Sequence, residues 1–190
     1  MSEKKQPILK GKQIKTRILR PSEYEVLREG AWKLENQTLL DACLLLGARY
    51  EECRRIQRTP GWFDGNFIHL PSEAQKKVKR TQVERWIRLS SMGKAILPYF
   101  FEAKKMPYVQ AWNENLLRWS KRKDLDPVGI TARSLRKTYE SWLIFSFPVA
   151  TNLIYLSQGH TTLTSLQHYV NLPFLDEDKK LMKQWVEGWI

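Results

Sequence analysis

The stretch from Asn36 to Tyr50, NQTLLDACLLLGARY, is nearly all apolar in its middle. A helix with this composition is buried on most of its sides, because it has no broad polar face to offer to water. Asn36 is a suitable N-cap for such a helix. The 22 aromatic residues of the chain, eight of them Trp, can supply the sizeable core that a buried helix needs.

Most of the remaining sequence also has a helical pattern. Pro21, followed by Ser and two Glu, opens a short helix, and Glu51–Gln57 forms another that is rich in Arg. After Ser90, helices are predicted near 91–104, 109–123, 132–146, 149–158, 162–170 and 177–189, broken or kinked by five prolines.

The region between these two groups of helices has the pattern of a small sheet. Gly61–Phe63 and Asn66–Leu70 are predicted to be short strands on either side of an Asp-Gly turn. Arg85–Leu89 alternates polar and apolar residues and is predicted to be a third strand. The sequence therefore predicts a mainly α (α+β) domain with a small three-stranded antiparallel sheet.

The net charge of +12 is concentrated in two segments. Residues 1–20 carry seven basic side chains against one acid, and residues 76–88 carry six against one. The last twenty residues are close to neutral, with three Lys against four acids. Two basic segments in a near-neutral frame indicate a polyanionic partner, with nucleic acid favoured over a merely solvated surface.

Several classes of protein do not fit the sequence. No stretch approaches the roughly 20 apolar residues of a membrane-spanning helix, and the N-terminus lacks the apolar core of a secretory signal, so we expect a cytoplasmic protein that contacts no membrane. Cys43 and Cys53 are too few for a disulfide scaffold and are expected to be buried thiols. Residues 1–17 are predicted to be a basic flexible arm or linker, and 18–190 a single domain.

Three short motifs carry the chemistry. The first, GARYEE, places Arg49 just past the apolar helix with a carboxylate three residues later. The second, ARSLRKT, begins a helix on which Arg133 and Arg136 share one face. In the third, His160 follows a glycine and precedes Tyr169 by nine residues.

Taken together, these motifs resemble the catalytic domain of the tyrosine recombinases, also called phage-type integrases. That family has an arginine in a G-x-R-x-x-E box, a lysine in a β-hairpin, an H-x-L-R motif on a helix, and a nucleophilic tyrosine nine residues after the histidine of L-G-H. The order and the intervals agree over roughly residues 18–175, and the sequence looks most like divergent archaeal and viral members. The resemblance implies a helical tyrosine-recombinase-type fold.

The resemblance also implies a reaction. Arg49 and Arg136 would bind the two non-bridging oxygens of the scissile phosphate, and His160 would hydrogen-bond the same group. Tyr169 would attack the phosphorus and form a 3′-phosphotyrosyl link, while a hairpin lysine protonates the leaving 5′-hydroxyl. A second 5′-hydroxyl then completes strand exchange. This chemistry requires neither a divalent ion nor ATP, so no cofactor is expected.

Two positions depart from the family pattern. Arg133 stands where the family has His, and an arginine stays protonated, so the role of general base passes to water, to another side chain, or to nothing indispensable. Arg133 is still expected to contact the phosphate. The hairpin loop is longer than usual; we assign Lys79 as the general acid, with Lys77 and Lys76 as alternatives, and we expect Lys76, Lys77 and Arg80 to bind DNA.

The expected partner is double-stranded DNA, on which the protein would assemble as a dimer or tetramer. Leu181, Trp185 and Trp189 form a stripe on the last helix that packs either on a neighbouring protomer or on its own domain. Because only about 17 residues precede the first predicted helix, we do not expect this sequence to contain the N-terminal DNA-clamping domain of the family. We therefore expect weak, salt-sensitive DNA binding, and either a fragment or a minimal protein.

Each motif also has a plainer explanation when it is taken alone. Arg49 can be a cation at a helix C-terminus, Arg133 and Arg136 a solvated face, Gly159 a left-handed helix cap, and Tyr169 a packing residue. At the level of function, the alternatives are a DNA-binding or architectural protein that has lost the chemistry, and a relaxing enzyme like the type IB topoisomerases.

Overall fold

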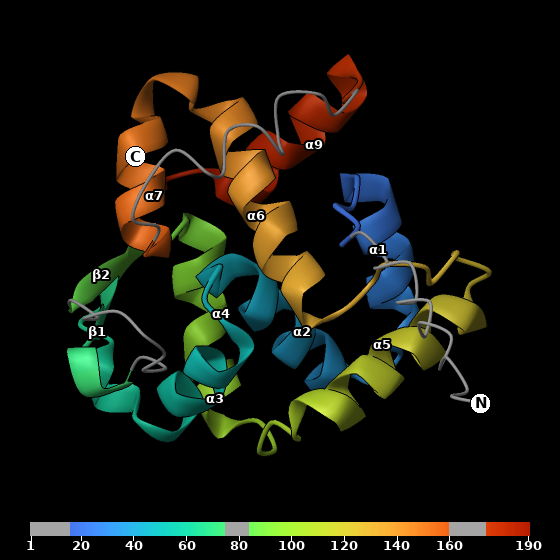
Figure 1. The fold of residues 1–190 in the computed structure, drawn as a ribbon, viewed down its shortest axis with the longest axis horizontal. Coiled ribbons are helices and arrows are strands. Elements are labelled where there is room, and N and C mark those ends of the chain that lie inside the picture. Colours follow the sequence, from blue (N-terminus) through green and yellow to red (C-terminus); the bar gives the residue numbers. More distant parts are fainter. Residues whose placement is uncertain (1–15, 75–83, 160–173) are drawn as a thin grey trace, which may run out of the picture.

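The computed structural model describes residues 16–74, 84–159 and 174–190, which are mainly helical with a small antiparallel sheet (Figure 1). The helices are α1 (Pro21–Gly30), α2 (Leu34–Leu46), α3 (Tyr50–Arg58), α4 (Ser91–Glu102), α5 (Val109–Arg122), α6 (Ala132–Ser146), α7 (Thr151–Gln158) and α9 (Asp176–Val186). The strands are β1 (Phe67–Leu70) and β2 (Arg85–Arg88), and short 3-10 turns cover Pro60–Trp62, Ser72–Ala74 and Pro148–Ala150. The helix predicted near 162–170 lies outside the described residues.

Helix α2 is the apolar segment that the sequence predicts to be buried, and it lies in the middle of the fold (Figure 1). Every residue from Thr38 to Leu46 is buried, and the helix packs against α1, α3, α4 and α6. The prediction of Asn36 as its N-cap is wrong, because the helix starts at Leu34 and the Asn36 side-chain oxygen accepts a hydrogen bond from Lys104 Nζ at 2.7 Å. Cys43 is a buried free thiol, as predicted, and burial raises the pKa of this thiol.

Helices α1, α6 and α9 pack together through aromatic side chains. The Tyr24 ring lies edge-on to the rings of Trp142 and Trp185, with centroids 5.9 Å and 5.1 Å away. Trp142 Nε1 donates a hydrogen bond to the backbone oxygen of Leu19 at 3.1 Å, so the indole is buried with its polar atom satisfied. These contacts connect the start of the described chain to its last two long helices.

The C-terminal stripe packs on its own domain, which was one of the two alternatives for it. Trp185 and Trp189 are buried, and Trp189 Nε1 donates to the backbone oxygen of Arg88 at 3.0 Å. Leu181 is the exception, because it remains 38% exposed. Assembly into a dimer or tetramer therefore remains a prediction, and these contacts within the domain do not bear on it.

The sheet has two strands among the described residues, not the three that were predicted. Strands β1 and β2 are antiparallel, with Phe67 opposite Arg88 and Leu70 opposite Arg85. The first predicted strand, Gly61–Phe63, is replaced by a 3-10 turn that begins at Pro60, and only a single bridge joins Phe63 to Ile68. The reason is that Pro60 cannot donate to a strand ladder, whereas its fixed φ suits the first position of a helical turn.

The Asp-Gly turn is present as predicted. Asp64 Oδ1 accepts hydrogen bonds from the backbone amides of Asn66 and Phe67 at 2.8 Å and 2.7 Å, and Gly65 has a φ of 99°. These bonds fix the entry into β1 and thereby its pairing with β2.

Two further observations concern the ends and the surface of the domain. Arg17, at the end of the predicted arm, donates its backbone amide to the Gly129 oxygen at 3.0 Å and pairs with Glu23, so this residue is attached to the domain.

None of the helices in the described part of the chain is long and apolar enough to cross a bilayer.

Candidate functional site

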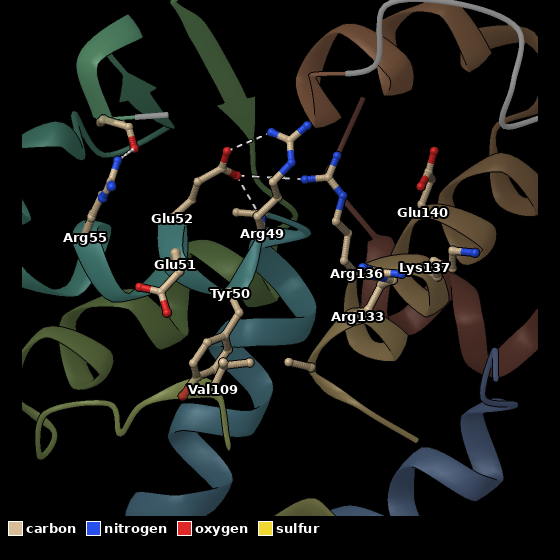
Figure 2. A pocket seen from close by; sticks show the side chains of 13 residues that line it. Arg49, Tyr50, Glu51, Glu52, Arg55, Val109, Arg133, Arg136, Lys137 and Glu140 are labelled. Carbon is tan, nitrogen blue, oxygen red and sulfur yellow. Dashed lines mark hydrogen bonds and ion pairs between the residues drawn. The ribbon is translucent and has the colours of Figure 1, made fainter. Parts of the chain in front are cut away.

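The buried carboxylate of Glu52 lies at the centre of the candidate site. Glu52 is 1% exposed and belongs to the first turn of α3, where its Oε2 accepts the backbone amide of Arg49 at 2.8 Å. Its Oε1 accepts Arg49 Nη1 at 2.9 Å (Figure 2). The first motif therefore folds back on itself, with the acid holding the arginine that precedes the helix.

Strand β2 brings a second arginine to the same carboxylate. Arg85 Nη2 donates to Glu52 Oε2 at 2.8 Å, and Arg85 Nη1 lies 3.4 Å from Oε1, so the pair is bidentate. Arg85 Nε donates to the backbone oxygen of Ser157 at 3.2 Å, which ties the strand to the end of α7. Both charged side chains are buried, as a hydrogen-bonded ion pair can be.

Helix α6 supplies the third arginine. Arg136 Nη1 lies 3.8 Å from Glu52 Oε2, and Arg136 Nη2 donates to the backbone oxygen of Gln158. Figure 2 shows the side chains of Arg49 and Arg136 approaching Glu52 from two different elements. Three guanidinium groups, from the residue preceding α3, from β2 and from α6, thus surround one carboxylate.

This arrangement shifts the pKa values of the buried groups. Burial alone would raise the pKa of Glu52, but the charge and hydrogen bonds of Arg85, with the amide and charge of Arg49, lower it to about 2. Burial, followed by the repulsion from Arg49, lowers the pKa of Arg136 to about 10. Glu52 is therefore ionised and Arg136 protonated at neutral pH. Because three arginine side chains surround one carboxylate, the cluster has a surplus of positive charge.

Two glycines allow the three motifs to approach this closely. Gly47 and Gly159 have φ values of 56° and 69°, in the left-handed region where each closes a helix. A Cβ atom on Gly47 would lie 2.4 Å from the Gln158 side chain, and one on Gly159 would lie 2.8 Å from Arg85 Nη1. The cap at Gly159 agrees with its plainer explanation, and the same residue also lies directly against the site.

A hollow of about 440 Å³ opens beside this cluster and is lined by residues of α3 and α6 (Figure 2). Its charged lining residues are Arg49, Arg55, Arg133, Arg136 and Lys137, with Glu51, Glu52 and Glu140. Arg133 is exposed, whereas Arg136 is 8% exposed. Five basic groups against three acids make the hollow a place where an anionic ligand of phosphate type is favoured.

The structure brings together the three predicted site residues that it describes. Arg49, Arg133 and Arg136 all line the one hollow, although the first and last are far apart in sequence. The other predicted site residues lie outside the described ranges, and these are Lys76, Lys77, Lys79, Arg80, His160 and Tyr169.

The sequence did not single out Arg85 as a site residue. A signal was nevertheless present in strand β2, where Arg85 and Ile87 are buried on one side while Trp86 is exposed on the other. The predicted strand is confirmed at Arg85–Arg88, but its polar and apolar residues do not separate onto two faces, since each face carries one arginine. An arginine on the apolar face of a strand requires an anion inside the protein.

No protein-family model matches this chain, and no curated protein matches it either. Within the described ranges, no group of three His, Cys, Asp or Glu side chains is arranged to hold a metal ion. The resemblance to the tyrosine recombinases therefore rests on the sequence motifs alone.

Proposed function

We propose that this protein is a site-specific recombinase or integrase that cleaves and rejoins DNA strands through a 3′-phosphotyrosyl intermediate on Tyr169. The observation that carries the proposal is the convergence of Arg49 and Arg136 on one hollow around Glu52. These arginines come from the first two motifs, 87 positions apart in the sequence. Solvated surface arginines have no reason to share one buried carboxylate.

The chemistry needs positive charge in fixed positions. Attack on a phosphodiester places additional negative charge on the non-bridging oxygens, and guanidinium groups stabilise that charge with directed donors. Arg49 and Arg136 would bind these oxygens, and Arg133, at the exposed side of the hollow, would add a third contact. Glu52 and Arg85 would act as positioning residues, since Glu52 accepts hydrogen bonds from Arg49 and Arg85 binds both oxygens of Glu52.

The remaining steps depend on residues assigned from the motifs. Tyr169 would form the covalent link as the 5′-hydroxyl leaves with a proton from Lys79, and His160 would hydrogen-bond the transferring phosphate. Gly159, the neighbour of His160, lies against Arg85, which is consistent with a third motif that reaches the same hollow. The link keeps the energy of the phosphodiester bond, so rejoining needs no external energy source.

The test is covalent capture of DNA. A pool of duplexes with a randomised central sequence and a nick on one strand traps the cleaved state, because the short fragment beyond the nick diffuses away. We expect a denaturant-resistant protein–DNA adduct in the parent protein, with the nucleotide mapped to the peptide that contains Tyr169. The adduct should be absent from Tyr169→Phe.

Tyr99→Phe provides the matched control, because Tyr99 is an exposed tyrosine on α4 and loses the same hydroxyl. This variant should form the adduct as well as the parent. If the parent forms no adduct, or if Tyr169→Phe forms it equally well, the proposed enzyme is wrong. Duplex binding without an adduct would instead support the alternative of an architectural DNA-binding protein, for which the replacement of His by Arg133 is the favouring observation.

A further inference from the structure

The β-hairpin presents an aromatic surface on its outward side. Phe67 lies opposite Arg88 and His69 opposite Trp86, so these four side chains lie on the same face of the two strands. We call them the hairpin face. The other side of both strands is buried, with Ile68 and Ile87 in the core, whereas Trp86 is 52% exposed.

The planar groups of the hairpin face lie against one another. The Trp86 ring stacks on the His69 imidazole with centroids 4.5 Å apart and an angle of 22° between the planes. The Phe67 ring stands edge-on to Trp86 at 6.4 Å, and the Arg88 guanidinium lies 5.2 Å from the Phe67 centroid. These contacts hold an exposed indole in one orientation, as a stacking surface requires.

Charge is distributed unevenly along the face. At one end, Arg88 and Lys94 line a hollow of about 70 Å³ together with Phe67 and Asn66. Lys94 Nζ is held 3.1 Å from Asn66 Oδ1. At the other end, the Glu84 carboxylate lies 3.0 Å from His69 Nε2. An anionic group is therefore favoured at the Arg88 end and disfavoured beyond His69.

We infer that the hairpin face binds unpaired nucleobases of single-stranded DNA, with a base stacked on Trp86 and the adjoining phosphate at Arg88 and Lys94. Side chains two positions apart on a strand are about 6.6 Å from each other, which suits a base and its own phosphate. Stacking suits any base, because every base has a π-face. Duplex DNA is disfavoured at Trp86, since paired bases already stack on one another inside the helix.

The inference goes beyond the proposed function, because stacking of a base on the hairpin face does not involve Tyr169. It has a structural connection to the candidate site through strand β2, whose Arg85 points to Glu52 while Trp86 points outward. A protein that released single strands at the site would have a surface for them on the reverse of the same strand. Binding of intact single strands and formation of a covalent adduct are nevertheless separate measurements, so either can fail alone.

The experiment measures binding by fluorescence anisotropy at fixed salt. The probes are a labelled oligothymidylate of about 12 nucleotides, within the site sizes of single-strand binders, and an oligomer with equally many phosphates but abasic sugars. We expect the parent to bind the oligothymidylate more tightly than the abasic oligomer. Trp86→Leu should lose about 5- to 150-fold in affinity for the oligothymidylate and little for the abasic oligomer, as expected for one stacked base.

Three further variants sharpen the result. Trp32→Leu is the matched control, because Trp32 is also an exposed tryptophan but lies under the Arg122 guanidinium in the corner between α1 and α2, away from the hairpin face. It should bind both probes like the parent, and Trp86→Tyr should retain most of the affinity. Lys94→Gln should weaken both probes alike and reduce the salt dependence by about one phosphate contact.

Equal affinity of the parent for the two probes would overturn the inference, as would equal losses in Trp86→Leu and Trp32→Leu. A hairpin face that docks a protein partner would give the same negative result. Because Trp86 points outward, Trp86→Leu should keep the circular dichroism spectrum of the parent, which separates lost stacking from lost folding.

Discussion

Arg85 and Arg136 lie at the base of the candidate site, 7% and 8% exposed, whereas Arg49 and Arg133 lie at its rim. At the base, the protein itself occupies the donors. Arg85 binds both oxygens of Glu52 and the Ser157 backbone, and Arg136 binds the Gln158 backbone. At the rim, the side chain of Arg49 is still 41% exposed.

The guanidinium group therefore has two different roles in this site, one at the base and one at the rim. A buried guanidinium must be neutralised to be tolerated, so the base of the site is coupled to the stability of the fold. An exposed guanidinium costs little and remains accessible to a ligand. Substitution of Arg85 at the base should therefore mainly change stability, and substitutions at the rim should mainly change DNA chemistry. Arg136 is buried and also lines the hollow, so its substitution should change both.

The largest effect is expected when the central carboxylate is removed. Glu52→Gln keeps the shape of the side chain but leaves Arg85 and Arg136 buried without the anion that compensates them. We expect a loss of about 3–5 kcal/mol in the free energy of unfolding, measured by urea denaturation at neutral pH. Glu51→Gln is the control, because Glu51 is a half-exposed neighbour that pairs with Arg54, and should cost less than about 1 kcal/mol. Similar losses in the two variants would mean that the base is not coupled to stability.

A smaller effect of the same carboxylate is expected in acid. The pKa of Glu52 is about 2 in the folded protein against an ordinary 4.5, so the folded state resists protonation more than the unfolded state does. The resulting stabilisation, about 3 kcal/mol at most, is fully present above the ordinary pKa and is lost as the pH falls toward 2. Urea unfolding at several pH values between about 5 and 2.5 measures the loss.

Glu52→Gln serves as the reference in that experiment, because it lacks the titrating group while the other carboxyls remain. The difference in stability between the parent and Glu52→Gln should therefore shrink as the pH falls. A difference that stays constant over this range would show that Glu52 does not carry the acid sensitivity.

Much of the helical fold follows from patterns within short stretches of sequence. Helix α2 was predictable because it is apolar nearly all round, and burial of Thr38–Leu46 follows from that composition. The strand count was not predictable in the same way. The stretch Gly61–Phe63 has aromatic residues suited to a strand, but Pro60 starts a 3-10 turn there instead.

The site was predictable where its motifs resemble those of a known family. The meeting of Arg49 and Arg136 was expected from the motifs, whereas the role of Arg85 depends on a partner 33 positions earlier in the chain. The residues around Arg85 in the sequence do not identify Glu52 as that partner. The sequence indicated only that Arg85 shares a strand face with the apolar Ile87. That pattern predicts a buried anion as the partner of Arg85 but does not identify the residue that supplies it.

The smallest effect on stability, and the sharpest test of the rim, is expected from Arg49→Gln. The pair between Arg49 and Glu52 is partly exposed and spans one helical turn, and Arg85 still neutralises the carboxylate after the change, so the cost should be less than about 1 kcal/mol. The rate of covalent adduct formation on the nicked duplex pool should nevertheless fall by about 10²- to 10³-fold, because a donor to the developing charge is lost.

Arg58→Gln is the matched control for this prediction. Arg58 lies at the end of the same helix α3, is exposed, and is not among the described residues that line the hollow, so the substitution removes an equal charge at a distance from Glu52. A general loss of DNA attraction would slow both variants alike and become smaller as salt is raised, since exposed charges are screened. A specific contact at the phosphate predicts instead that only Arg49→Gln is slow, and that it stays slow at saturating DNA.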